Sequence, residues 1–209
     1  MRAASSQRAL QALQKPLAWM LCLAPAIYLL AQLFSDGLGA NPVEALIRAT
    51  GDWALRGLCV VLALTPLQVS LKWITLARLR RLLGLFAFFY AVLHVLAYTW
   101  LDMAWSWSAI WDDVRQRWFI LAGVCAFLIL LALAISSHTA ILRAMGGKKW
   151  KRLHQGIHGL AWLALLHFFW MRSGKNDVAE VLVYAAIIAA LQGWRLLRWA
   201  RRRRAASSA

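Results

Sequence analysis

Five histidines stand in or beside the apolar stretches of this 209-residue chain, and imidazole is the side chain best suited there to bind a metal or move a proton. They are His94, His138, His154, His158 and His167. An ionisable side chain inside a hydrocarbon span is costly and by default marks a functional position. His94 is such a residue, because it follows the apolar run 88–93 and its span contains no acid. The alternative is a neutral ring hydrogen-bonded to the hydroxyl of Tyr90 or Tyr98.

His94 and His167 are predicted to lie at a similar depth. His94 comes 12 residues after Leu82, where its apolar run begins, and His167 comes 13 residues after His154, a helical rise of about 20 Å. The two runs are the third and fifth of the chain, so they cross in the same direction. Two neutral imidazoles that face each other at one depth form an axial pair for haem iron. The aromatic residues near His94 can pack a porphyrin, although such runs in membrane helices are commonly ordinary packing: Phe86, Phe88, Phe89, Tyr90 and Tyr98.

His154 is predicted to serve a different position from His167. Thirteen residues at about 100° each leave a remainder of about 220°, so the two rings do not share one helix face. At the depth of His154 the third run offers Arg80 and Arg81 instead of a histidine. An arginine stays protonated, so it suits a haem propionate or a flavin phosphate better than it suits iron.

The other two histidines carry weaker signals. His158 is one turn beyond His154 and is interpreted as a polar residue on its helix, with an iron ligand or a supporting donor as the alternatives. His138 follows the fourth run among hydroxyl side chains and is predicted to be interfacial. Zinc is the rival metal for these histidines, but it takes three or four close ligands and no cysteine or acid is near them.

The elements that position the histidines are six apolar runs. The chain is 62% hydrophobic and 15% charged, against about 25% charged residues in soluble domains, so a soluble fold is a poor interpretation. A bilayer core needs about 20 apolar residues per helix. The runs of this kind are approximately 16–34, 53–69, 82–101, 118–135, 154–171 and 178–194. We therefore predict an all-α membrane protein, a six-transmembrane-helix bundle that forms a single domain over 1–209, with a basic tail at 195–209.

The net charge of +16 indicates the orientation of the bundle. Lys and Arg are retained on the cytoplasmic side of membranes. The N-terminus, the second and fourth loops and the tail hold 18 of the 24 basic residues, whereas all eight acids fall in the other loops. Both termini are thus predicted to be cytoplasmic. Because the charges are interspersed with apolar runs rather than spread over a folded basic surface, nucleic-acid binding is set aside.

Five tryptophans crowd the loop between the third and fourth runs, and tryptophan prefers the headgroup level of a bilayer. They are Trp100, Trp105, Trp107, Trp111 and Trp118. We expect this loop to lie on the membrane surface, where an external partner can meet it.

The cysteines exclude one form of haem attachment. Cys22, Cys59 and Cys125 form no C-x-x-C-H pattern, so haem is not covalently attached in the c-type manner.

A cleaved signal peptide is the alternative for the first apolar run, but that run is long for one and five more follow it.

Three segments have distinctive patterns: ALTPL at 63–67, RRLLGLFAFFY at 80–90 leading to His94, and KWKRLH at 149–154 followed by His167. Together they resemble the MsrQ (YedZ) family of haem-binding membrane subunits, which belongs to the ferric-reductase-like transmembrane superfamily shared with NADPH oxidases. On the family's pattern, His94, His154 and His167 are the haem-ligand positions. The superfamily's oxidases carry two histidines on each haem helix, whereas the third run here has only His94. The inner site then holds a second haem with an unusual ligand, a flavin, or only a charged lip where electrons enter.

The resemblance implies a b-type cytochrome with one or two haems b, and FMN is also reported as a cofactor of the family. Electrons would pass from the quinone pool or a cytoplasmic flavin reductase to MsrP, a periplasmic molybdopterin enzyme that reduces methionine sulfoxide in oxidised proteins. The chain would then be the electron-transfer subunit of a heterodimer in the bacterial inner membrane, with no catalytic residues of its own.

Two other functions stay open from the residues themselves. One is a transmembrane ferric or other metal reductase, which needs the same haem but no protein acceptor. The other is a non-redox transporter or assembly protein in which the histidines relay protons. The chain has no Gly-rich nucleotide-binding motif, so an electron donor and acceptor must be separate molecules.

Overall fold

The computed structural model describes residues 2–72, 76–174 and 177–207, and these residues fold almost entirely into helices. The final two residues of the predicted basic tail, Ser208 and Ala209, lie outside the described part. The elements are α1 (Arg2–Phe34), α2 (Pro42–Ser70), α3 (Leu76–Leu96), the π-helical turn η1 (Ala97–Asp102), α4 (Trp107–Gln116), α5 (Trp118–Ser136), α6 (Thr139–Met145), α7 (Gly147–His154), α8 (Ile157–Ser173) and α9 (Ala179–Ser207). The described residues contain no strand, which confirms the predicted all-α fold.

Five stretches of the described chain are long and apolar enough to cross a bilayer, which confirms a helical membrane protein. They are Leu13–Phe34, Pro42–Ser70, Leu76–Asp102, Trp118–Ser136 and Ala179–Ser207. The remaining predicted span, 154–171, corresponds to α8, which has 17 residues and therefore a length of about 26 Å. The six-span topology accordingly stays a prediction.

The boundary of this span differs from the expected one. His154 was expected to open the helix that contains His167, but it closes the short helix α7. A turn at Gln155 and Gly156 separates α7 from α8, and the Gly156 N–H donates to the Leu153 carbonyl at 2.9 Å. A side chain at Gly156 would place its Cβ 2.9 Å from that same carbonyl oxygen, so the tight turn depends on glycine.

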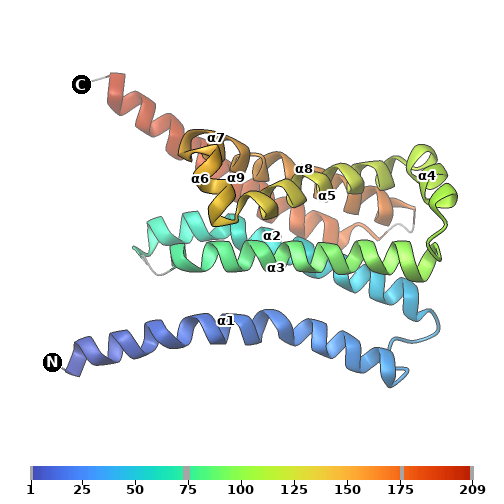
Figure 1. Cartoon of the computed structure of the whole chain (residues 1–209). Coiled ribbons are helices and arrows are strands. Elements are labelled where there is room, and N and C mark those ends of the chain that lie inside the picture. The colour runs from blue at the N-terminus through green and yellow to red at the C-terminus, as the bar shows by residue number, and fades with distance from the viewer. Residues whose placement is uncertain (1, 73–75, 175–176, 208–209) are drawn as a thin grey trace.

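Both ends of the chain lie at one end of the bundle (Figure 1). That end, here called the terminal end, also carries α6 and α7, whereas α4 lies at the opposite end (Figure 1). The predicted distribution of basic and acidic loops follows the same division. Which membrane face each end meets is part of the predicted orientation.

Two antiparallel helix pairs form the body of the protein. α2 packs along α3, α5 packs along α8, and α9 closes the bundle against α2 and α8. The buried core joins these helices through Leu62 of α2, Ala161 of α8 and Ile188 of α9, each at most 1% exposed. Small residues permit the close approach of α2 and α3, since a Cβ built on Gly57 would lie 3.1 Å from the Ala87 Cβ.

Two arginines fasten α9 to α2. Pro66 lies inside α2 and has no N–H, so the Leu62 carbonyl one turn earlier lacks its usual helical donor. Arg195 of α9 supplies the missing donor, with an Nη–O distance of 2.6 Å. Nearer the α4 end, Arg56 donates through Nε to the Tyr184 hydroxyl at 3.0 Å. The arginines therefore form hydrogen bonds with polar groups that would otherwise lack a partner in the apolar helix interface.

Candidate functional site

The rings of His94 and His167 face each other between the two helix pairs. His94 comes from α3 and His167 from α8, and their ring centroids lie 6.0 Å apart with planes crossing at 83°. Both side chains are half-buried. Residues 73 positions apart in the sequence thus meet at the one depth that their spacing predicts.

A main-chain carbonyl holds the back of each ring. The Nδ1 atom of His94 lies 2.8 Å from the carbonyl oxygen of Ile47 in α2. The Nδ1 atom of His167 lies 2.6 Å from the carbonyl oxygen of Phe119 in α5. A carbonyl can only accept, so Nδ1 must carry the proton and donate it in both rings. Each Nε2 is therefore left with a lone pair, the state in which imidazole binds a metal.

The hydroxyl alternative for His94 is not what the structure contains. The Tyr90 hydroxyl donates to the Cys22 carbonyl at 2.6 Å and accepts from the Ala26 N–H at 3.1 Å, which ties α3 to α1. The Tyr98 hydroxyl donates to Asp113 at 2.7 Å. Since both tyrosines are engaged elsewhere, His94 is not present merely to satisfy a neighbouring hydroxyl.

The pair fits the axial ligation of one metal better than it fits zinc. A metal–imidazole bond is about 2 Å long, so two rings bound from opposite sides of one metal have centroids about 6 Å apart. The observed separation of 6.0 Å already matches this requirement. Among the described residues, no group of three or more His, Cys, Asp or Glu side chains comes together to hold a metal ion. A structural zinc site has no basis there, whereas a haem needs only the two imidazoles.

His154 has quite different surroundings. Its Nε2 atom lies 3.1 Å from the Ser136 hydroxyl, and its ring stacks on Trp150 with centroids 4.1 Å apart. The Trp150 indole N–H donates to the Ser136 carbonyl at 3.0 Å, so the three side chains form one cluster between α5 and α7. His154 lies outside the long apolar helices, and burial lowers its pKa below the usual range of histidine. The ring is accordingly neutral at pH 7, but its Nε2 is already engaged.

The two arginines predicted beside this inner position contact different neighbours. Arg80 donates to Thr65 and Gln68 of α2, each at 3.2 Å. Arg81 lines a hollow between α1 and α3 together with Lys15, Trp19, Arg78, Leu82 and Leu85. The structure thus separates two residues that sequence reasoning treated as one group.

The other two histidines lie near the terminal end. His138 is the N-cap residue of α6, and its interfacial place stays a prediction. The His158 Nδ1 atom on α8 is buried without a hydrogen-bond partner in the described part of the chain, and so is the Arg195 Nε atom. Sequence reasoning did not single out Arg195, because only the structure shows that it meets a helix carbonyl freed by a proline.

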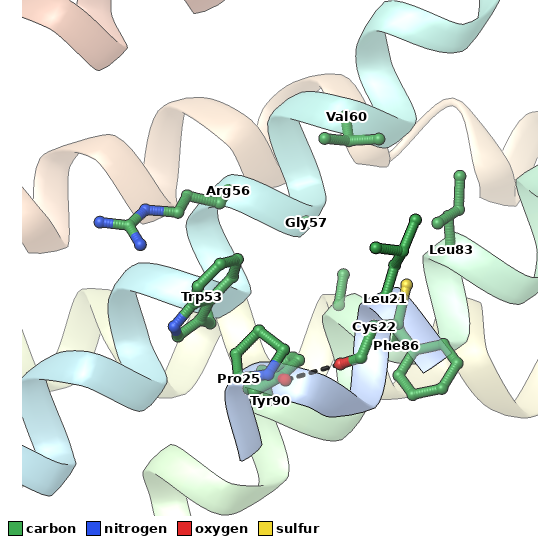
Figure 2. Close-up of a pocket in the computed structure, with 11 residues that line it drawn as sticks. Leu21, Cys22, Pro25, Trp53, Arg56, Gly57, Val60, Leu83, Phe86 and Tyr90 are labelled. Atoms are coloured by element: carbon green, nitrogen blue, oxygen red, sulfur yellow. Dashed lines mark hydrogen bonds between the residues drawn. The ribbon is translucent and has the colours of Figure 1, made fainter. Parts of the chain in front are cut away.

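Some of the aromatic residues near His94 face away from the histidine pair. Figure 2 shows Phe86 and Tyr90 lining a cavity of about 140 Å³ between α1, α2 and α3, together with Cys22 and Trp53. Phe86 also packs edge-on against Trp19, while Phe88 stacks on Phe127 of α5 with centroids 6.0 Å apart. Phe86 and Tyr90 therefore pack toward α1, which is the ordinary packing that the sequence analysis gave as common for such runs.

The α4 end of the site is fixed by one carboxylate. Asp113 of α4 accepts from the Tyr98 hydroxyl and pairs with Arg117, with an Nε–O distance of 2.9 Å. Tyr98 follows His94 by one turn, and Arg117 is the N-cap of α5, two residues before Phe119. The predicted surface loop is thus a helix that is tied to η1, directly after the helix that bears His94, and to the start of α5, whose Phe119 carbonyl contacts His167. It leaves Trp107 and Trp111 more than half exposed.

The fold and the facing histidines define a class of protein, the ferric-reductase-like transmembrane proteins. The model of the family described as "Ferric reductase like transmembrane component" matches residues 50–167, a range that contains all five histidines. No solved structure matches the chain.

Curated relatives then identify the family within this class. A protein of Polaromonas naphthalenivorans is 54% identical over 93% of this chain and 89% of its own length. Relatives from Bordetella pertussis, at 46% identity over 82% of this chain and 83% of their length, and Rhodospirillum rubrum, at 42% over 88% and 87%, are also similar. All three are named "Protein-methionine-sulfoxide reductase heme-binding subunit MsrQ". The chain belongs to the MsrQ family, as the sequence motifs indicated.

Proposed function

We propose that this chain is a haem-binding membrane subunit that conducts electrons to a partner enzyme, and that His94 and His167 are the residues that would hold a haem b. The observation that carries the proposal is the pair of rings at 6.0 Å whose Nδ1 atoms are both held by main-chain carbonyls. Such a pair leaves the Nε2 lone pair of each neutral ring free to bind a metal.

When bound, the haem supplies a one-electron couple. The Ile47 and Phe119 carbonyls accept from Nδ1–H and so keep each imidazole in the tautomer whose Nε2 has a free lone pair. The same hydrogen bonds increase the basicity of each ring. The helices half-bury both rings, and Asp113 holds α4 against the same end of the bundle. The chain therefore binds and orients a redox group but performs no bond-breaking chemistry.

The name of the relatives points to a protein-methionine-sulfoxide reductase as the proposed partner. The family resemblance adds that this partner is a periplasmic MsrP-type molybdopterin enzyme, which repairs methionine sulfoxide in oxidised proteins. The proposed topology has six spans with both termini in the cytoplasm of a bacterial cell, so α4 faces the periplasm. Electrons then leave near α4, and they arrive from the quinone pool or a cytoplasmic flavin reductase at the terminal end.

The inner position is proposed to receive those electrons. His154, Arg80 and Arg81 lie at the terminal end, where a second haem b or FMN would be held. Because His154 is hydrogen-bonded through Nε2 to Ser136, it must exchange that bond before it can act as an iron ligand. Arginine at this end suits the carboxylate or phosphate of such a cofactor.

A metal reductase is the second candidate, since the matching family model is described as ferric-reductase-like. The two functions share the haem and differ in the acceptor. Reduced protein mixed with a periplasmic methionine sulfoxide reductase should be reoxidised if the first proposal holds. Reoxidation by chelated iron alone, with no response to the reductase, would favour the second.

The decisive first experiment is an absorption spectrum of the purified full chain in detergent. We expect the bands of a six-coordinate b-type haem in the wild type and in the His138→Ala control, and their loss in His94→Ala and in His167→Ala. A colourless protein, or haem lost only from His138→Ala, would contradict the proposal.

A further inference from the structure

Two glycines stand directly behind the two facing histidines. A Cβ built on Gly51 of α2 would lie 3.0 Å from Nδ1 and 3.2 Å from Cε1 of His94. A Cβ built on Gly123 of α5 would lie 2.8 Å from Nδ1 and 2.9 Å from Cε1 of His167. Carbon atoms of side chains rarely come this close to a ring, so neither position has room for any residue other than glycine unless the ring moves.

Each glycine also stands one helical turn after the carbonyl that accepts from the same ring. Ile47 precedes Gly51 by four residues, and Phe119 precedes Gly123 by four. In a helix, residues four apart lie above one another on one face. Each ring therefore lies against the helix backbone where the glycine has no side chain. Its Nδ1–H donates to the carbonyl, and its edge contacts the glycine.

The arrangement occurs twice, on unrelated segments of the chain. α2 supports His94 of α3, and α5 supports His167 of α8. The segments Ile47–Gly51 and Phe119–Gly123 share only the glycine and its spacing from the acceptor. Glycine within a helix is unfavourable relative to alanine, but at both positions the adjacent ring leaves no space for the alanine methyl group.

We propose that Gly51 and Gly123 are positioning residues for the histidine pair: the missing side chain lets each ring reach the carbonyl one turn earlier, which turns its Nε2 toward a shared iron. The inference rests on the proposed haem binding and adds the means by which the helices set ligand geometry. A methyl group at either position pushes the ring from its carbonyl, so the imidazole donates less strongly and the ferric state is less stabilised.

The chain offers matched controls on each helix pair. Gly84 of α3 and Gly159 of α8 have no heavy atom within 4 Å of a built Cβ, so their alanine variants test the substitution itself. Gly57 of α2 meets the Ala87 Cβ at 3.1 Å, so Gly57→Ala tests tighter α2–α3 packing away from the ring.

The experiment compares the full-length alanine variants in detergent by haem-to-protein ratio, rate of haem transfer to apomyoglobin, spin state and midpoint potential. We expect about tenfold faster haem loss for Gly123→Ala, as is typical when a group that orients a metal ligand is disturbed. A smaller increase is expected for Gly51→Ala, because its Cβ would lie farther from the ring. Both should show a higher potential and a high-spin fraction. Gly84→Ala and Gly159→Ala should match the wild type, and Gly57→Ala should change only the melting temperature.

The outcomes separate this inference from the proposed function. Wild-type protein without haem would end both. Haem that depends on His94 and His167 but is unchanged in potential and spin state by Gly51→Ala and Gly123→Ala would leave the function standing and overturn the inference. An equal shift in Gly57→Ala would also overturn it, since ordinary packing would then explain the effect. If Gly123→Ala does not fold, Gly51→Ala decides.

Discussion

The outer and inner histidine positions differ in what each ring has at its two nitrogens. At the outer position, His94 and His167 use Nδ1 for a main-chain carbonyl, which leaves Nε2 free, and their rings lie 6.0 Å apart. At the inner position, His154 uses Nε2 for Ser136 and stacks on Trp150, and its ring is not paired with a second histidine in the described part of the chain. The fold thus prepares one axial pair completely and leaves the other position dependent on rearrangement.

The largest loss of haem is expected when either histidine of the outer position is replaced. Replacing His94 or His167 by alanine removes one of only two imidazoles, so the outer haem should fall to less than about a tenth of its wild-type occupancy. The haem-to-protein ratio, measured as the pyridine haemochrome, checks this. His158→Ala lies on the same helix as His167 and should retain the haem. Equal loss in that variant would assign the effect to the fold of α8.

A smaller effect is expected at the inner position. His154→Ala should leave the outer haem in place and abolish only reduction from the cytoplasmic side, with any second haem lost at the same time. The measurement is haem content together with the rate of reduction by a quinol. Complete loss of haem from His154→Ala would place the principal ligand at the wrong end of the bundle.

Arg195→Leu should test whether the terminal end is held by the arginine–carbonyl contact. The Leu62 carbonyl freed by Pro66 would lose its donor, at a cost of about 1–3 kcal/mol in the free energy of unfolding. A lower melting temperature with an unchanged outer haem spectrum is the expected result. The double variant Pro66→Ala with Arg195→Leu restores a helical donor and should recover part of the loss. No recovery would mean that Arg195 acts through another contact.

Asp113→Asn should have the smallest effect. The amide keeps one hydrogen bond but weakens the contact with Arg117, so α4 becomes less firmly held, by about 0.5–1.5 kcal/mol. The outer haem should be retained, while electron transfer to an external acceptor slows severalfold. Stopped-flow reoxidation checks the rate, with Asp112→Asn as the exposed control on α4. Equal rates in both variants and the wild type would remove α4 from the proposed exit.

The sequence predicted the features that depend on the length of apolar runs and on the free-energy cost of an ionisable side chain inside a membrane. Long apolar runs must become helices in a membrane, and an imidazole in such a run needs a function, so the bundle and the pairing of His94 with His167 followed from spacing. The side-chain directions did not follow. Phe86 and Tyr90 turned toward α1, and His154 ended α7 rather than beginning α8, because local turns and helix rotation decide such details.

Main-chain partners were the least predictable part of the site. Nothing in the identity of Ile47 or Phe119 marks its carbonyl as an acceptor, since every residue has one. The only trace in the sequence is the glycine one turn later, and single glycines are common in membrane helices. The link from Pro66 through Leu62 to Arg195 was equally hidden, because it joins residues 133 positions apart.

Electron paramagnetic resonance of the ferric full-length protein distinguishes the two histidine positions when His154→Ala is compared with His94→Ala and His167→Ala. If His94 and His167 hold the haem, a low-spin bis-imidazole signal persists in His154→Ala and disappears in each of the other two variants. A bis-imidazole signal that survives in His94→Ala or His167→Ala and is lost in His154→Ala would contradict the assignment of the facing pair as the haem ligands.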